Sequence, residues 1–236
     1  MSSELKNYLL NNYSDCINTV TELSKNLHSN ESSVTSDKQL FNFDKLVKKI
    51  CSNNPHTSAD AMYIKDNAIT FIEFKGGFHD LISEETKDIS LIRCPRDNTI
   101  ECNDYYNIFL EKRKKEKKIL KNNLICKIIE TFVFYKYELL NLIDNSNSNQ
   151  NIKLYFLVVI NDNLEEYENI LLDSASGSIA ISSDIENSNN VIKQIKQFTK
   201  RFRNKDGRYY YHNVSACRVD EFKEKLEQYI SLWYIF

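Results

Sequence analysis

The 236-residue sequence contains no run of about 18 apolar residues, the length that a helix needs to cross a bilayer. Its start, MSSELKNYLLNN, lacks the charged segment and the long apolar stretch of a secretion signal. The six cysteines are scattered, without a C-x-x-C pair or a histidine at zinc-finger spacing, which argues against a disulfide scaffold and a structural zinc site. We therefore expect a soluble, cytoplasmic protein with no membrane partner.

A large excess of either charge is also absent, since the formal net charge is −2. The basic residues are nevertheless concentrated in residues 112–121 and 193–208, so the total does not exclude a nucleic-acid partner. Residues 112–121 would either follow a phosphate backbone or form a solubilising face. The second stretch predicts an amphipathic helix whose basic stripe is a candidate nucleic-acid-binding surface: Lys193, Lys196, Lys200 and Arg203.

The length allows a substantial core and no internal repeat is visible, so we expect a single domain over residues 1–236. We interpret three parts in chain order: an N-terminal helical cover (1–37), a core (38–160) and a C-terminal extension (161–236). Apolar spacing predicts these elements: helices over residues 4–28, 38–51 and 107–143, strands over 153–160 and 209–219, and a last helix from Asp220.

A hairpin is the feature around which the core is organised. Residues 60–65 and 68–75 are rich in β-branched and aromatic side chains and flank Asp66-Asn67, a dipeptide typical of a two-residue hairpin turn. If the residues on either side of this turn pair with each other, both faces of the hairpin are mostly apolar. That pattern predicts a position in the middle of a sheet covered on both sides.

This register places Asp60 opposite Glu73, with Lys75 on the same face. Opposed like charges destabilise a sheet unless something compensates them. A divalent cation is a natural compensation, since two carboxylates on adjacent strands can close on one Mg²⁺ at about 2.1 Å. In the alternative interpretation, Asp60 only begins a strand, and Glu73 and Lys75 form an edge ion pair.

Asp60, followed by Glu73-x-Lys75 at the end of the next apolar strand, resembles the motif of the PD-(D/E)XK nuclease superfamily. Ala59 stands where the proline that names the motif would be, at a position that varies widely in the superfamily. The resemblance covers residues 39–160 and implies an α/β fold with a restriction-endonuclease-like α-β-β-β-α-β core. Its mixed central sheet would be flanked by helices, with extra N- and C-terminal helical elements. One strand of this core is not located, and residues 90–93 are a candidate.

The resemblance also implies a site. Asp60 and Glu73 would bind one or two Mg²⁺ ions, for which Mn²⁺ could substitute, and Lys75 would position or polarise the attacking water. The helix before the hairpin often supplies a further acid in this superfamily. Asp44 is the only acid within residues 38–51, and it is therefore a candidate ligand or else a solvated helix residue.

The helix after the hairpin packs next to the site in this superfamily and often adds a polar residue. Lys127 and Glu130, three residues apart on the predicted helix, are secondary site candidates. A structural ion pair between them is the alternative.

We therefore expect a metal-dependent endonuclease that hydrolyses phosphodiester bonds, with DNA preferred to RNA as the substrate. One alternative is a catalytically inactive nuclease-like module that binds nucleic acid or a protein partner. Another is a structural protein whose charges form ion pairs in the core. The sequence does not fix the oligomeric state and is compatible with a homo-oligomer.

Overall fold

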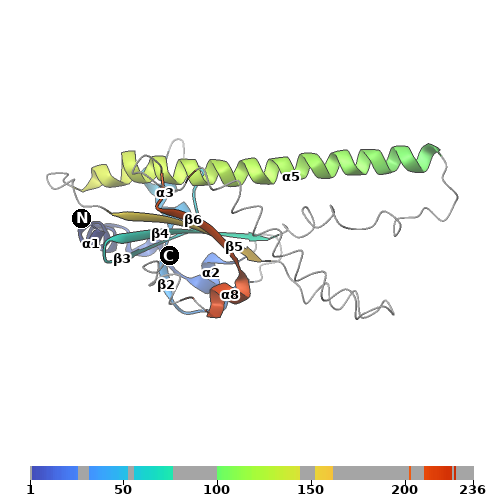
Figure 1. The fold of residues 1–236 in the computed structure, drawn as a ribbon. Helices are drawn as coiled ribbons and strands as arrows, with labels where there is room; N and C mark the ends of the chain where they lie inside the picture. The colour runs from blue at the N-terminus through green and yellow to red at the C-terminus, as the bar shows by residue number, and fades with distance from the viewer. Residues whose placement is uncertain are drawn as a thin grey trace.

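The computed structural model describes residues 2–25, 32–52, 56–76, 100–143, 152–161, 202, 210–224 and 226. Its centre is a six-stranded mixed sheet in which the strands follow chain order (Figure 1). The strands are β1 (Ile17–Thr19), β2 (Gln39–Asn42), β3 (Ala61–Lys65), β4 (Ala68–Gly76), β5 (Lys153–Asn161) and β6 (Asn213–Arg218). Neighbours from β1 to β4 are antiparallel, whereas β4, β5 and β6 run parallel. The predicted α/β class with a mixed central sheet flanked by helices is confirmed.

The hairpin register expected from the sequence is confirmed. Lys65 pairs with Ala68, and the ladder continues to Ala61 opposite Ile72. Asp66 takes a φ of 49°, a left-handed conformation that Asp tolerates better than most residues and that this tight turn requires. Because β3 begins at Ala61, Asp60 lies immediately before the strand.

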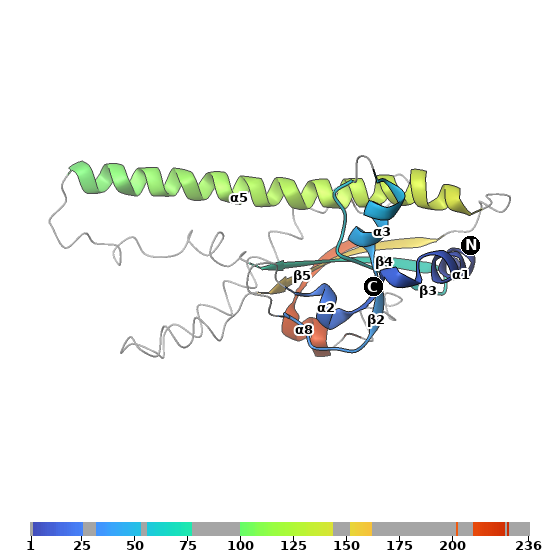
Figure 2. The ribbon, with the colours of Figure 1, turned by 180° about the vertical axis from the view of Figure 1, so that it is seen from behind.

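Helices cover the two faces of the sheet unequally. On one face lie α1 (Ser2–Asn12), α3 (Phe43–Ile50) and the long α5 (Ile100–Phe134); on the other lie the short α2 (Val20–Leu23) and α8 (Val219–Glu224). Figures 1 and 2 show α5 on one side of the strands and α2 and α8 on the other. None of the described helices is long and apolar enough to span a membrane.

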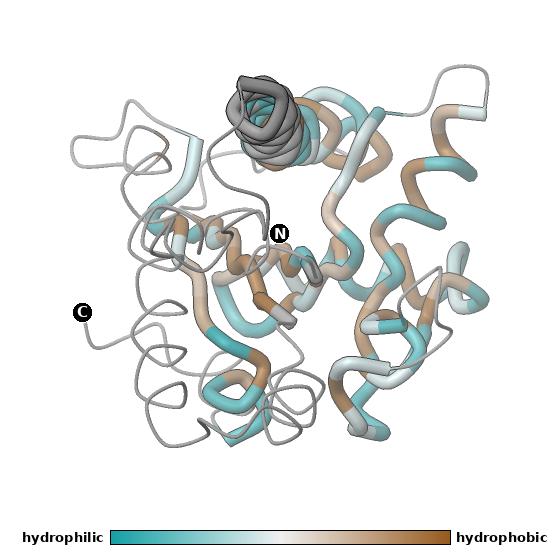
Figure 3. Tube along the Cα trace, turned by 90° about the vertical axis from the view of Figure 1, so that its right-hand side faces the viewer, coloured by the Kyte–Doolittle hydropathy of each residue, from teal (hydrophilic) through white to brown (hydrophobic). Residues whose placement is uncertain are grey.

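Strand periodicity gives each face its own core. On the α5 side, Met62 and Phe71 of the hairpin pack with Ile128 of α5. On the opposite side, Ala61 and Ile72 pack with residues from α2 and α8. Figure 3, in which α5 points toward the viewer, shows hydrophobic and hydrophilic residues following one another along the same segments, as expected for elements with one buried side.

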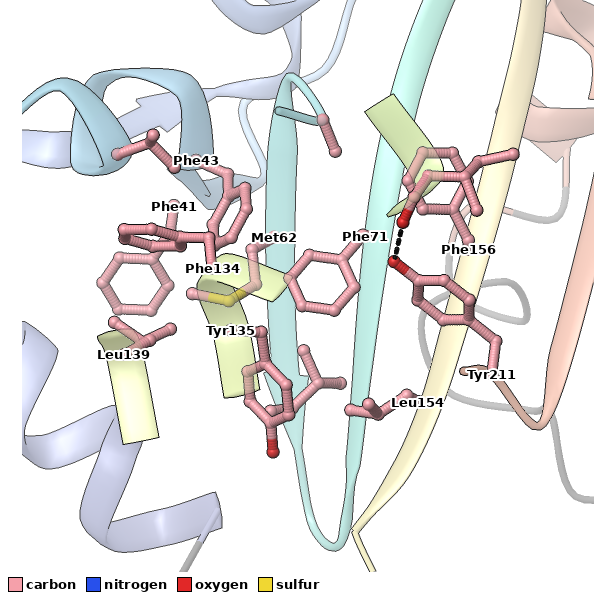
Figure 4. Close-up of a cluster of buried hydrophobic side chains, with 14 of the residues drawn as sticks. Phe41, Phe43, Met62, Phe71, Phe134, Tyr135, Leu139, Leu154, Phe156 and Tyr211 are labelled. Carbon is pink, nitrogen blue, oxygen red and sulfur yellow. Dashed lines mark hydrogen bonds between the residues drawn. The ribbon is translucent and has the colours of Figure 1, made fainter. Parts of the chain in front are cut away.

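The first core is largely aromatic (Figure 4). The ring of Phe71 makes edge-to-face contacts with Phe43 of α3, at 4.9 Å between centroids, and with Tyr135 just beyond α5. Tyr211, also in edge contact with Phe71, is fully buried, and its hydroxyl donates to the Ile128 carbonyl of α5 at 2.8 Å. These contacts fix α5 over the centre of the hairpin. Burial also holds the pKa of Tyr211 well above its ordinary value.

Two helical predictions near the N-terminus are wrong in part. Residues 17–19, inside the predicted helix over 4–28, form β1, so the N-terminal segment also contributes a sheet strand. Residues 39–42, inside the predicted helix over 38–51, form β2. The helix begins only after Asn42, whose side chain accepts from the Lys45 N–H and whose backbone is extended, as an N-cap requires.

β2 pairs antiparallel with β3, so that β2, β3 and β4 form an antiparallel run. Residues 90–93, the candidate for the strand that the sequence did not locate, lie outside the described residues. The predicted long helix is present as α5, and it continues through a π-helical turn (Tyr135–Leu139) and a 3₁₀ turn (Leu140–Leu142). The strand predicted over 153–160 is β5, and the predicted last helix is α8, which begins at Val219.

Candidate functional site

Four charged side chains meet on the α5 face of the hairpin. Glu73 lies in β4, two residues after Phe71, so the alternation of the strand turns it toward the same side as that core ring. Asp60 stands at the start of the neighbouring strand, and Lys75 follows Glu73 by two residues. Lys127 comes from α5, which crosses above the hairpin. The hairpin and the helix together therefore build the site.

The ammonium of Lys127 lies between the two carboxylates. Its Nζ donates to Glu73 Oε1 at 2.7 Å, to Glu73 Oε2 at 2.8 Å and to Asp60 Oδ1 at 3.2 Å. Lys75 Nζ lies 3.0 Å from Glu73 Oε1. The expectation that the carboxylates of Asp60 and Glu73 converge on a shared cation thus agrees with the geometry, but the cation in this structure is an ammonium from the chain itself.

The main chain of β4 orients Asp60. Its second oxygen, Oδ2, accepts from the Phe74 N–H at 2.7 Å. Because that oxygen is engaged, Oδ1 is the one that points at the shared cation. One carboxylate is therefore held by a backbone hydrogen bond and the other by the strand that carries it.

The site is closed at one end and open at the other. Glu73 has no solvent exposure, whereas the side chains of Asp60, Lys75 and Lys127 are 27%, 23% and 21% exposed. A buried carboxylate is costly unless it is paired and hydrogen-bonded, and both lysines serve that purpose here. Solvent therefore reaches the site at Asp60, Lys75 and Lys127, but not at Glu73.

Burial and the nearby Asp60 carboxylate raise the pKa of Glu73 to about 7, although Lys127 and Lys75 oppose the rise. Burial alone would lower the pKa of Lys127, but the charges of Glu73 and Asp60 outweigh it and leave that pKa raised. The pKa of Lys127 is raised because the carboxylates beside it carry negative charge. The pKa of Glu73 is raised because a buried carboxylate is costly to ionise. The lysine is therefore charged at neutral pH, and Glu73 exchanges its proton in that range.

Residues of α5 one turn further on hold the segment that leads to Asp60. Glu130 Oε2 accepts from both the N–H and the hydroxyl of Thr57, each at 2.7 Å. The hydroxyl of Thr131 accepts from the Ala59 N–H at 2.9 Å. In place of the alternative, an ion pair between Lys127 and Glu130, the structure has two separate contacts: Lys127 reaches the carboxylates of Asp60 and Glu73, and Glu130 anchors the chain at Thr57.

Asp44 is engaged by residues outside the site. It forms an ion pair with Lys48 one turn along α3, and its Oδ1 accepts from the Ser58 hydroxyl at 3.3 Å. Among the described residues, no group of three or more His, Cys, Asp or Glu side chains could hold a metal ion. The structure therefore does not bring Asp44 together with Asp60 and Glu73. The predicted nucleic-acid-binding residues lie outside the described ranges: Lys193, Lys196, Lys200 and Arg203.

The donor set fits a hard divalent cation. Three carboxylate oxygens already converge on one positive centre, and Mg²⁺ is commonly held by one or two carboxylates together with waters and phosphate oxygens. Two protein carboxylates are therefore enough to hold such an ion together with water ligands.

The position of Lys127 has a signal in the sequence that the motif alone does not give. It falls between Leu124 and Thr131 on the buried stripe of α5, at spacings of three and four residues. A lysine on such a stripe needs a buried anionic partner. The Thr57 and Phe74 contacts have no comparable signal, because they depend on backbone N–H groups.

Comparison of the chain with protein-family models, with curated proteins and with solved structures finds no match.

Proposed function

We propose that this protein is a metal-dependent nuclease of the PD-(D/E)XK type, which hydrolyses phosphodiester bonds of DNA rather than RNA with Mg²⁺ or Mn²⁺. The observation that carries the proposal is the convergence of Asp60 and Glu73 on one cation, with Lys75 beside Glu73 on the same strand. These are the residues of the D…E-x-K motif, and they come together at the covered centre of a sheet.

The order of the elements gives further support. Three antiparallel strands, β2, β3 and β4, are followed by α5 and then by β5, which is parallel to β4. The helix α3 lies between β2 and β3, where the expected core has its first helix before the first strand. The antiparallel run and the helical crossover to a parallel strand are otherwise consistent with the β-β-β-α-β part of a restriction-endonuclease-like core. Asp60 lies immediately before the second strand of that run, and Glu73 and Lys75 lie in the third.

Each residue has a defined task in this proposal. Asp60 Oδ1 and the Glu73 carboxylate would hold Mg²⁺, which supplies Lewis-acid stabilisation of phosphoryl charge and a metal-activated water. The Phe74 N–H keeps Asp60 oriented, and the complete burial of Glu73 keeps bulk water from the inner side of the site. Lys75, partly exposed, can hold a water by hydrogen bonding and offset negative charge that develops on the phosphate.

A cleavage assay tests the proposal with plasmid, single-stranded DNA and RNA as substrates, in Mg²⁺ or Mn²⁺. We expect cleavage by the wild type, and a loss of about 10²–10⁴-fold for Lys75→Ala, whose carboxylates still bind metal. Asp60→Ala and Glu73→Ala should lose metal binding, measured by calorimetry. Lys65→Ala, at the exposed turn of the same hairpin, is the matched control and should cleave like the wild type.

A second candidate is a module that binds nucleic acid or a protein without cutting. The observation that favours it is Lys127, which satisfies both carboxylates without a metal. A wild-type protein that cleaves no substrate in either metal, or a Lys75→Ala variant as fast as wild type, would contradict the nuclease. Binding of nucleic acid without cleavage would then favour this module.

A further inference from the structure

Lys127 uses its full hydrogen-bonding capacity in the site. A lysine ammonium has three N–H donors, and the Nζ of Lys127 lies 2.7–3.2 Å from three carboxylate oxygens, two on Glu73 and one on Asp60. Such charge-assisted hydrogen bonds are about twice as strong as neutral ones. The three oxygens that converge on this ammonium are the ones that a metal held by Asp60 and Glu73 would need.

A metal and this ammonium cannot share those oxygens. Mg²⁺ requires oxygen ligands at about 2.0–2.1 Å in a near-octahedral shell, which leaves no room for an ammonium among the same atoms. The net charge of the site also argues against simultaneous binding of the metal and the ammonium. Two carboxylates balanced by Lys75 and Lys127 are close to neutral, and a divalent ion added beside both lysines would leave an excess of two positive charges in a mostly buried site.

We propose, building on the nuclease function above, that Lys127 is a built-in counter-ion that occupies the metal position in the metal-free protein and is displaced when a divalent cation binds. It stabilises the buried carboxylates before loading, and it lowers the apparent affinity for metal because its three hydrogen bonds must break first. The side chain is partly exposed, so the displaced ammonium has a path toward the open edge beside Asp60. There it would meet the phosphate of a substrate.

Calorimetric titration with Mn²⁺, without nucleic acid, tests this inference on the full chain. Lys127→Met keeps the length of the side chain and removes its charge. We expect it to bind Mn²⁺ at least tenfold more tightly than the wild type, and to melt at a lower temperature than wild type when no metal is present, because its buried carboxylates are then uncompensated. Lys118→Met, on an exposed position of the same helix, is the matched control and should change neither value.

Lys127→Gln provides a second measurement if Lys127→Met does not fold, because its neutral amide can still donate to the same carboxylates. Its affinity for Mn²⁺ should also rise. If the wild type binds Mn²⁺ and the folded variant binds it equally or more weakly, Lys127 is not the occupant of the metal position, and the nuclease proposal is unaffected. If neither the wild type nor the variants bind Mn²⁺, both proposals are overturned.

Discussion

Glu73 is the residue whose environment is hardest to explain without a function. It has no solvent exposure, it faces a second carboxylate, and it lies in the middle of a strand where an apolar side chain would pack well. Replacing buried ionic groups with apolar residues is often neutral or stabilising, so folding alone does not call for this arrangement. A charged group that a well-packed core does not need, beside a partly open edge, is typical of a functional site.

The stability of the metal-free protein should report on the proton of Glu73. The pKa of this group is about 7 in the folded protein and about 4.5 in the unfolded chain, so between those values the folded state holds a proton that the unfolded state has lost. The stabilisation that the Glu73 proton gives to the folded state is therefore fully present below pH 4.5 and is lost as the pH rises to about 7. Across that window we expect the free energy of unfolding to fall by about 3 kcal/mol because of Glu73.

Urea denaturation of the wild type and of Glu73→Gln at several pH values between 4.5 and 7.5 isolates this effect. The amide does not titrate, so the difference between the two proteins should change across the window while other groups cancel. If the free energies of unfolding of the two proteins differ by the same amount at every pH, Glu73 keeps an ordinary pKa in the folded protein.

At this scale the sequence predicted that Asp60 and Glu73 lie close together, but it did not predict which cation lies between them. The D…E-x-K spacing identified Asp60, Glu73 and Lys75, because a hairpin turn fixes which residues oppose each other. It did not predict that Lys127 would already compensate the two carboxylates, since that contact joins residues more than fifty positions apart and depends on where α5 crosses the sheet. Local sequence patterns determine the register of a hairpin. The place where a helix crosses a sheet is instead set by the packing of the whole core.

At the scale of elements, strands that are short and end in a helix cap were the hardest to predict. β2 is four residues long and runs directly into α3, so Leu40 continues the helical stripe of Phe43 and Val47 although it lies in a strand. The buried strand β5 and the long helix α5 were predicted because their patterns extend over many residues. The β3-β4 hairpin was predicted because its turn chemistry is local.

The contact between Tyr211 and α5 offers a test of how the helix is held over the sheet. The buried Tyr211 hydroxyl donates to the Ile128 carbonyl, one residue from Lys127 (Figure 4). Tyr211→Phe keeps the ring and removes this bond, so it should lower the free energy of unfolding by about 0.5–1.5 kcal/mol in denaturant titrations. Tyr137→Phe, on a tyrosine that is 56% exposed, is the matched control and should stay within about 0.5 kcal/mol of wild type.

Equal stabilities for the two Phe variants would mean that the hydroxyl adds nothing beyond the packing of its ring. Measurements of Mn²⁺ binding by the same two variants separate an effect on stability from an effect on the site. Because Tyr211 lies beneath α5 and does not contact the carboxylates, its Phe variant should keep Mn²⁺ binding unless the position of Lys127 depends on that bond.

At the scale of the whole molecule, charged residues are concentrated in particular segments of the chain. The sheet and its cores hold few charges apart from the site, while the basic stretch over residues 112–121 lies on α5, which extends well beyond the strands (Figure 1). Lys115, Lys118 and Lys121 of that stretch are exposed. The near-neutral net charge therefore does not describe the field around the site, because a nucleic acid would respond to local basic surfaces.

The salt dependence of binding tests whether the second basic stretch guides a nucleic acid to the site. A variant with Lys193, Lys196, Lys200 and Arg203 all changed to Gln should lose up to about 0.9 in the slope of log affinity against log salt for each phosphate contact removed on duplex DNA. Fluorescence anisotropy at several salt concentrations, without divalent metal so that no cleavage occurs, measures this slope.

The matched control carries the same change in net charge at four exposed lysines spread over other elements: Lys6, Lys25, Lys65 and Lys223. A general effect of net charge would reduce the slope of both variants alike, because it does not depend on which lysines are removed. Release of counterions at a defined contact surface would reduce the slope of the first variant alone. An unchanged slope in the first variant would show that its basic stripe is only a solvated face, and the exposed lysines of α5, Lys115, Lys118 and Lys121, would be the next basic surface to test.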